Sequence, residues 1–127
     1  MPDKTEYGTG PAGEREAARF LEQKGYKILE KNFQAAGSEV DLIALKEDTL
    51  CFIEVKTRGS NKYGMPEEFV DRRKRRRIIR AAKIYAAREE FQDLYIRFDI
   101  ISLLYKAGDG EPGNRINHIR HAFEEYS

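Results

Sequence analysis

The chain has 127 residues, of which 40% are hydrophobic and 35% are charged. This length suits one domain with a single core, and the composition is far from that of a disordered chain. We predict a core spanning residues 12–123 after a loosely ordered lead-in, residues 1–11. The net charge of +1 does not indicate a nucleic-acid-binding protein, so that function must rest on where the 23 basic residues lie. The chain shows neither a signal-peptide pattern nor a long apolar run, which favours a cytoplasmic protein without membrane contact.

The first predicted element is a helix. Helical spacing of apolar residues places it from Gly13 to Lys24, with Gly25 as its C-terminal cap. Glu14 lies in the first turn, where the helix dipole favours a carboxylate, so by itself it is typical of a helix start. Residues 26–33 then predict a short strand.

The next stretch, residues 39–56, predicts an antiparallel β-hairpin. Two alternating apolar runs flank the polar linker 46–49, which indicates a four-residue loop. Because side chains alternate along a strand, the loop sets a register in which four pairs share one face. These pairs are Leu45 with Leu50, Ile43 with Phe52, Asp41 with Glu54, and Glu39 with Lys56.

The charged part of this face suggests a metal site. Two opposed carboxylates repel, so Asp41 and Glu54 need a proton, a cation or a metal ion between them. Metal-dependent phosphodiester hydrolysis uses hard oxygen ligands for Mg²⁺ and a cation beside the attacking water or the phosphate. Asp41 and Glu54 are candidate ligands, with the Val55 carbonyl as a further one, and Lys56 is the candidate cation. Glu39 is predicted to orient Lys56. The alternative for Glu54 and Lys56 is a surface salt-bridge ladder.

A second, longer helix is predicted after a loop at residues 57–65. Residues 66–68 and Asp71 are two candidate starts, and the helix is expected to end near Glu90. Six consecutive cations, residues 72–77, surround this helix because successive residues are 100° apart. A phosphate-binding surface explains why their repulsion is tolerated, and a solubilising helix start balanced by acids is the alternative. The predicted nucleic-acid contacts are Arg58, Arg72, Arg73, Lys74, Arg76 and Arg77, with Lys62 and Lys83 extending the basic rim.

The remaining residues complete a mixed α/β sheet. Residues 94–104 are β-branched and aromatic and predict a central strand, in which Arg97 and Asp99 form a structural ion pair. A loop is predicted at residues 106–114, and residues 115–123 favour an edge strand over a terminal helix. Two histidines without a third ligand do not predict a zinc site. Cysteine occurs once, on the hairpin face opposite the acids, and is predicted to be a small core residue.

Short segments along the chain form a wider pattern. They are Gly13-Glu14, Ala17-Ala18, Gly25-Tyr26, Asn32, Glu39–Ala44, Phe52–Arg58, Arg97–Asp99, His118-Ile119 and Ala122-Phe123. Together they resemble the bacterial YraN family, from about Gly13 to Phe123. That largely uncharacterised family is placed in the restriction-endonuclease-like PD-(D/E)XK superfamily, with archaeal Holliday-junction resolvases among its similar relatives.

The resemblance implies a restriction-endonuclease-like fold, with a mixed sheet of about five strands flanked by helices. It implies a site of Asp41, Glu54 and Lys56, with Glu14 as an additional acidic metal-site residue. Lys74 matches the family's lysine and is the first choice among the helix cations to face the site.

The sequence therefore predicts a nuclease-like protein dependent on Mg²⁺ or Mn²⁺ that acts on DNA phosphodiester bonds, with structured or branched DNA as candidate substrates. Two alternatives stay open: a nucleic-acid-binding module without catalysis, and a protein-interaction or assembly domain. A homodimer is expected from resolvase-like folds that present two sites.

Overall fold

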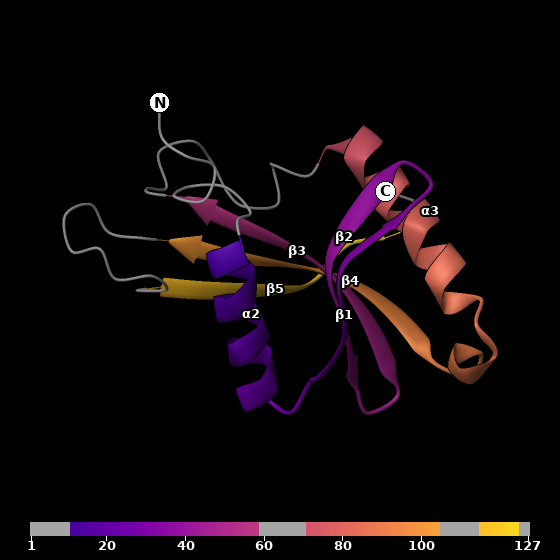
Figure 1. Cartoon of the computed structure of the whole chain (residues 1–127), viewed down its shortest axis with the longest axis horizontal. Coiled ribbons are helices and arrows are strands. Elements are labelled where there is room, and N and C mark those ends of the chain that lie inside the picture. Colours follow the sequence, from indigo (N-terminus) through magenta and orange to yellow (C-terminus); the bar gives the residue numbers. More distant parts are fainter. Residues whose placement is uncertain (1–10, 59–70, 105–114, 125–127) are drawn as a thin grey trace.

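Five strands form one mixed sheet, and two helices cover its opposite faces (Figure 1). The computed structural model describes residues 11–58, 71–104 and 115–124. The predicted α/β class and five-stranded mixed sheet are confirmed. The elements are α2 (Pro11–Gln23), β1 (Lys27–Ala35), β2 (Ser38–Lys46), β3 (Thr49–Arg58), α3 (Arg72–Ala86), the 3-10 turn η2 (Glu89–Phe91), β4 (Tyr95–Leu104) and β5 (Arg115–Phe123).

Several predictions fall on residues outside the described ranges. These are the lead-in up to residue 10, the loops at 59–65 and 106–114, the helix start at 66–68, and Lys62. Among the described residues, no helix is both long and apolar enough to cross a membrane.

The β2–β3 hairpin has the predicted register with a shorter turn. Lys46 pairs with Thr49, so only Glu47 and Asp48 form the turn and the prediction of a four-residue loop is wrong. Glu47 has a φ of 53°, the left-handed conformation that a two-residue hairpin turn uses at its first central position. The pairs Leu45 with Leu50 and Ile43 with Phe52 are confirmed.

β3 and β4 lie side by side and parallel, joined by a crossover that contains α3. Their pairing continues to Arg58 and Leu104, so the predicted loop does not begin at Thr57. β5 pairs antiparallel with β4 at the edge of the sheet, which confirms a strand for the last segment.

The two helices pack their apolar residues against opposite faces of the sheet, and each forms its own cluster of buried residues. The α3 face buries Ile43 and Phe52 against Ile78 and Tyr85. The α2 face includes Cys51, which is fully buried as predicted, and burial raises the pKa of its thiol to about 12. Each helix thus covers one layer of core residues supplied by the same hairpin.

The ends of both helices follow local chemistry. Gly25, with a φ of 91°, turns the chain out of α2 as predicted. The carboxylate of Asp71 caps α3 by accepting a 2.9 Å hydrogen bond from the Lys74 N–H, which confirms the second candidate start. α3 ends at Ala86 rather than near Glu90, because Arg88 adopts an extended conformation.

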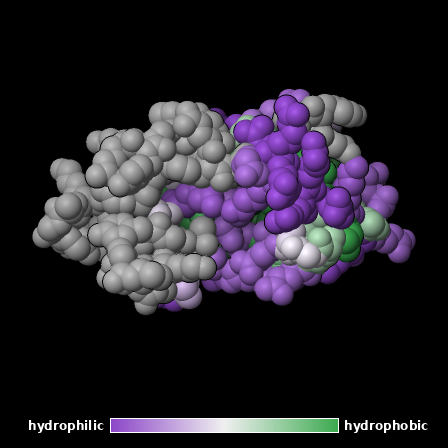
Figure 2. All heavy atoms as spheres, turned by 90° about the horizontal axis from the view of Figure 1, so that it is seen from above, coloured by the Kyte–Doolittle hydropathy of each residue, from purple (hydrophilic) through white to green (hydrophobic). Residues whose placement is uncertain are grey.

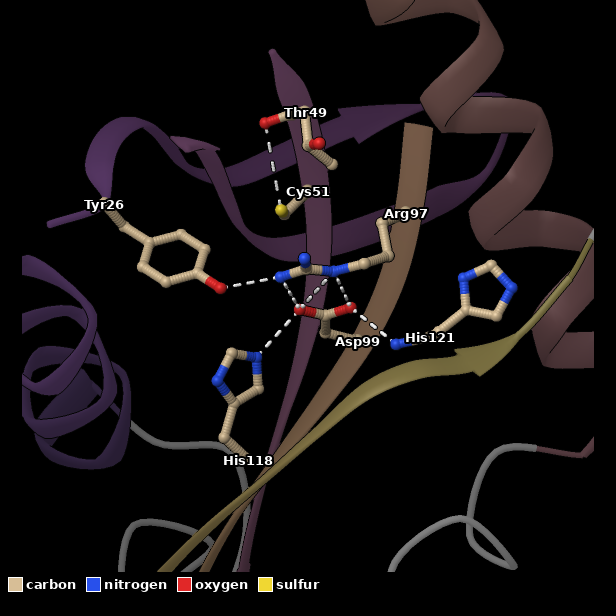
Figure 3. Close-up of polar contacts among 7 residues, drawn as sticks. All are labelled: Tyr26, Thr49, Cys51, Arg97, Asp99, His118 and His121. Carbon is tan, nitrogen blue, oxygen red and sulfur yellow. Dashed lines mark hydrogen bonds and ion pairs between the residues drawn. The ribbon is translucent and has the colours of Figure 1, made fainter. Parts of the chain in front are cut away.

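A polar network surrounds the buried Asp99 on the α2 face of the sheet (Figure 3). Arg97 Nη2 lies 2.9 Å from Asp99 Oδ2 and donates a 2.7 Å hydrogen bond to the Tyr26 hydroxyl. His118 Nε2 lies 2.8 Å from the same Asp99 oxygen, and the His121 N–H donates to Asp99 Oδ1. The predicted ion pair is confirmed. The network connects β4 with β5 and with Tyr26, the residue before β1, so it stabilises this edge of the sheet.

We expect this network to make stability depend on acidity. Burial raises the pKa of Asp99, but hydrogen bonds from His118, Arg97 and the His121 backbone outweigh burial, so the pKa is lowered overall. A lowered pKa contributes stability above the pKa of the unfolded chain, about 4, and that stability is lost as pH falls through the native pKa. Asp99→Asn should cost about 3 kcal/mol at pH 7 and remove this part of the acid dependence.

Urea unfolding from pH 7 down to pH 3 measures both effects, with Asp93→Asn as the exposed control. Equal stabilities of the Asp99 variant and the control at pH 7 would contradict the structural role of this ion pair.

Candidate functional site

Two buried carboxylates lie where β2 and β3 separate. The last pair between these strands is Leu42 with Ile53, and beyond it β2 stays with β1 while β3 stays with β4 (Figure 1). Asp41 and Glu54 follow directly, and each is only 4% exposed. Asp41 Oδ2 accepts a 2.8 Å hydrogen bond from the Val55 N–H, which holds its carboxylate against β3.

This pair is electrostatically unfavourable without a cation. Burial raises the pKa of Asp41 well above its usual range, and the negative charge of Glu54 and a hydrogen bond to that side chain raise it further. The two carboxylates therefore share a proton or require positive charge beside them.

Two lysines supply positive charge to Glu54. Lys56 Nζ lies 3.7 Å from Glu54 Oε2, and Lys74 from α3 forms an ion pair with the same oxygen. Burial lowers the pKa of Lys74, but the charge of Glu54 and a hydrogen bond to it outweigh burial and raise the pKa overall. Burial lowers the pKa of Lys56, and contact with Lys74 lowers it further. The charge of Glu54 favours both ammonium groups, but only for Lys74 does it outweigh the effect of burial on the pKa.

Glu14 reaches the same place from α2. Carboxylate oxygens of Glu14, Glu39 and Asp41 all lie within 4.8 Å of one another, an arrangement that could hold a metal ion. The pKa of Glu14 is raised, first by burial and then by the charge of Glu39. Asn32 Nδ2 donates a 2.8 Å hydrogen bond to Glu14 Oε1 and lies 3.5 Å from Glu39 Oε1.

A close contact between α2 and β3 positions Glu14. A Cβ atom added to Gly13 would lie 2.6 Å from Thr57 Oγ1, so only glycine lets this turn of α2 approach β3 so closely. Thr57 Oγ1 is itself buried and has no hydrogen-bond partner among the residues that the structure describes. The close approach of α2 to β3 at Gly13 thus brings the neighbouring Glu14 to the carboxylate pair.

Glu39 is placed differently from the sequence-based expectation. Among the described residues no ion pair joins Glu39 to Lys56. Glu39 instead accepts hydrogen bonds from Asn32 and Gln34 of β1, because β2 pairs with β1 at this point. Sequence reasoning assigned no role to either amide. Asn32 has a φ of 54°, a conformation that asparagine adopts more readily than most residues. Its contact with Glu39 cannot be predicted without knowing the register between β1 and β2.

The site opens into a cavity beneath the start of α3. Its volume is about 500 Å³. Seen from above, most of the described surface is hydrophilic (Figure 2). Of the predicted nucleic-acid contacts, three line it: Arg73, Lys74 and Arg77. The other lining residues are Gly37, Ser38, Glu39, Asp41, Glu54 and Asp71.

The other predicted cations lie elsewhere. Arg72 and Arg76 are exposed and do not line the cavity. Lys83 borders a separate hollow formed with residues of β4 and β5. Arg75, which was not a predicted contact, lies over the Phe123 ring at 5.6 Å. Arg58 ends β3, and the structure does not describe its side chain.

The donor set fits a hard divalent cation. The predicted ligands Asp41 and Glu14 offer carboxylate oxygens, the ligands that Mg²⁺ and Mn²⁺ prefer, and the third member of their cluster is Glu39. The third predicted ligand, Glu54, is buried beside Asp41 but is not part of that cluster. The raised pKa of Asp41 indicates the same need, because a bound cation would remove the cost of two adjacent negative charges.

Fold and site together define a mixed α/β protein with a buried acidic centre beneath a basic helix. Residues 13–103 match the model of the uncharacterised protein family UPF0102, and the chain belongs to this family. A UPF0102 protein of Caldanaerobacter subterraneus subsp. tengcongensis is 45% identical over 90% of this chain and 93% of its own length. A UPF0102 protein of Clostridium perfringens strain 13 is 43% identical over 87% of this chain and 89% of its own length. A third, from Persephonella marina, is 39% identical over 91% of this chain and 92% of its own length. The family part of the resemblance is thereby confirmed.

We expect Asp41→Asn to stabilise the metal-free protein. A carboxyl whose pKa is raised on folding holds a proton in the native state, so stability falls as pH rises from about 4 towards the native pKa. An asparagine can still accept from the Val55 N–H but carries no charge. The variant should gain about 1–3 kcal/mol at pH 8 and lose this pH dependence.

Urea unfolding with EDTA at pH 5 to 8 measures the gain. If Asp41→Asn is less stable than the unmodified protein at pH 8, the charge of Asp41 does not destabilise the native state and this account of the carboxylate pair is wrong.

Proposed function

We propose that this protein is a nuclease-like, Mg²⁺- or Mn²⁺-dependent protein that acts on DNA phosphodiester bonds. The observation that carries the proposal is the buried pair Asp41 and Glu54, with Lys56 and Lys74 beside it, at the base of a cavity lined by arginines. Hydrolysis of a phosphodiester needs charge neutralisation and a positioned water, and these residue types supply both functions.

Each residue has a role in this proposal. A bound divalent ion would supply Lewis acidity and a water of lowered pKa, and Asp41, Glu54 and Glu14 would hold it. Lys56 would donate N–H groups to the phosphate as negative charge develops. Arg73 and Arg77 would bind the flanking backbone, because guanidinium groups match phosphate oxygens well.

The resemblance described above supports the same assignment by analogy. If the family belongs to the PD-(D/E)XK superfamily, as the resemblance implies, Asp41, Glu54 and Lys56 would correspond to its site motif. Structured or branched DNA is the substrate that this analogy favours, with a cytoplasmic homodimer as the acting form.

Cleavage of nucleic acid tests the proposal directly. Linear, flapped and four-way DNA and a matched RNA are incubated with Mg²⁺, Mn²⁺ or EDTA. We expect metal-dependent cleavage of a DNA substrate that falls to background in Asp41→Ala and Glu54→Ala. Lys56→Met should reduce the rate by about 10²–10³-fold, because it removes one group that stabilises developing charge.

The exposed Glu90→Ala variant is the matched control and should cleave normally, and circular dichroism shows whether each variant is folded. Absence of cleavage with every substrate and both metals would reject the enzymatic proposal.

Binding without cleavage is the second candidate, and the arginines of the cavity favour it independently of catalysis. Arg73 and Arg77 should each account for about 0.9 of the slope of log K against log salt, because each contacted phosphate releases counterions. We expect Arg73→Gln and Arg77→Gln to weaken binding to DNA and to lower this slope by about that amount each.

Arg19→Gln, an exposed substitution on α2 across the sheet, is the control of equal charge change. If this variant lowers the slope as much as the two cavity variants do, the cavity is not the binding surface. If no nucleic acid binds at all, the assembly-domain alternative is favoured.

A further inference from the structure

Glu54 is contacted by two ammonium groups at one oxygen. Lys74 Nζ forms the ion pair with Oε2, and Lys56 Nζ lies 3.7 Å from the same atom. The two lysines come from different elements, α3 and β3, and they also contact each other. Bringing two like charges together beside a buried carboxylate costs free energy, so Lys74 needs a reason to lie there beyond neutralising Glu54.

The ammonium group of Lys74 contacts a carboxylate oxygen that the proposed metal ion would use, Glu54 Oε2. Mg²⁺ lies about 2.1 Å from its carboxylate oxygens and requires near-octahedral surroundings. An ammonium in direct contact with Glu54 Oε2 takes up space and charge that such an ion needs. Lys74 and the ion therefore cannot both contact this oxygen in the arrangement seen here.

Lys74 can leave without a change of fold. Its backbone is held by the Asp71 cap of α3, whereas its side chain is a flexible four-carbon stem that is 38% exposed. The side chain also lines the cavity together with Arg73 and Arg77. A small rotation of the stem would transfer the ammonium from the acidic centre to the arginine-lined part of the same cavity.

We propose that Lys74 takes the place of the divalent cation beside Asp41 and Glu54 in the metal-free protein, and that metal binding displaces it towards a phosphate of the nucleic acid. This inference rests on the metal site proposed above. It makes the two ligands cooperative: the ion frees a phosphate-binding cation, and by linkage the nucleic acid strengthens binding of the ion. The basic cavity would then be complete only when the site is loaded.

A titration of the full-length protein with Mn²⁺, followed calorimetrically, tests the exchange. Lys74→Met should bind Mn²⁺ at least about tenfold more tightly than the unmodified protein, because no cation has to be displaced. Lys74→Arg keeps the charge and should bind no more tightly than the unmodified protein. Arg77→Gln is the matched control, because it removes one charge from the same cavity without an ion pair to Glu54, and it should change the affinity by less than about threefold.

Each outcome is decisive for one of the two proposals. Equal tightening in Lys74→Met and Arg77→Gln would mean that general electrostatics explains the effect, and unchanged affinity in Lys74→Met would reject the exchange while leaving the metal site standing. If Mn²⁺ binds to none of the proteins, the proposed metal site fails and the exchange fails with it. Circular dichroism in EDTA confirms that the variants are folded, and Lys74→Arg gives an independent answer if Lys74→Met does not fold.

Discussion

Burial of Asp41 beside Glu54 is the constraint on which the rest of the site depends. Each carboxylate is almost fully buried, and the Val55 N–H holds Asp41 against the strand that carries Glu54. Burial raises the pKa of Asp41, and repulsion by the charge of Glu54 raises it further. A fold does not need such a pair for its own stability, because an apolar pair at this position would cost less. Its presence is understandable if a cation completes the arrangement.

Positive charge and further acids are brought to this pair from opposite faces of the sheet. The close contact of Gly13 with Thr57 brings Glu14 from α2, whereas the Asp71 cap sets the start of α3 so that Lys74 meets Glu54. The edge of the sheet is stabilised separately by the Arg97–Asp99 network (Figure 3). The scaffold and the site therefore rely on different charged residues, and substitutions can test one without removing the other.

Local sequence pattern predicted the parts of this fold that short-range chemistry decides. The hairpin register, the Gly25 turn and the Asp71 cap each follow from a few neighbouring residues. The two-residue turn was missed because Lys46 and Thr49 are polar yet still pair.

The partners of Glu39 were missed for a different reason: they depend on β1, which the hairpin register does not include. The division of the six cations around α3 likewise depends on how the helix packs on the sheet, which its sequence alone does not specify.

Anomalous diffraction from a crystal soaked in Mn²⁺ tests the central claim, that Asp41 and Glu54 hold a divalent cation, most directly. The account predicts a peak between Asp41 and Glu54, at about 2.1 Å from an oxygen of each. A well-ordered crystal with a peak only elsewhere, or with none, would contradict it.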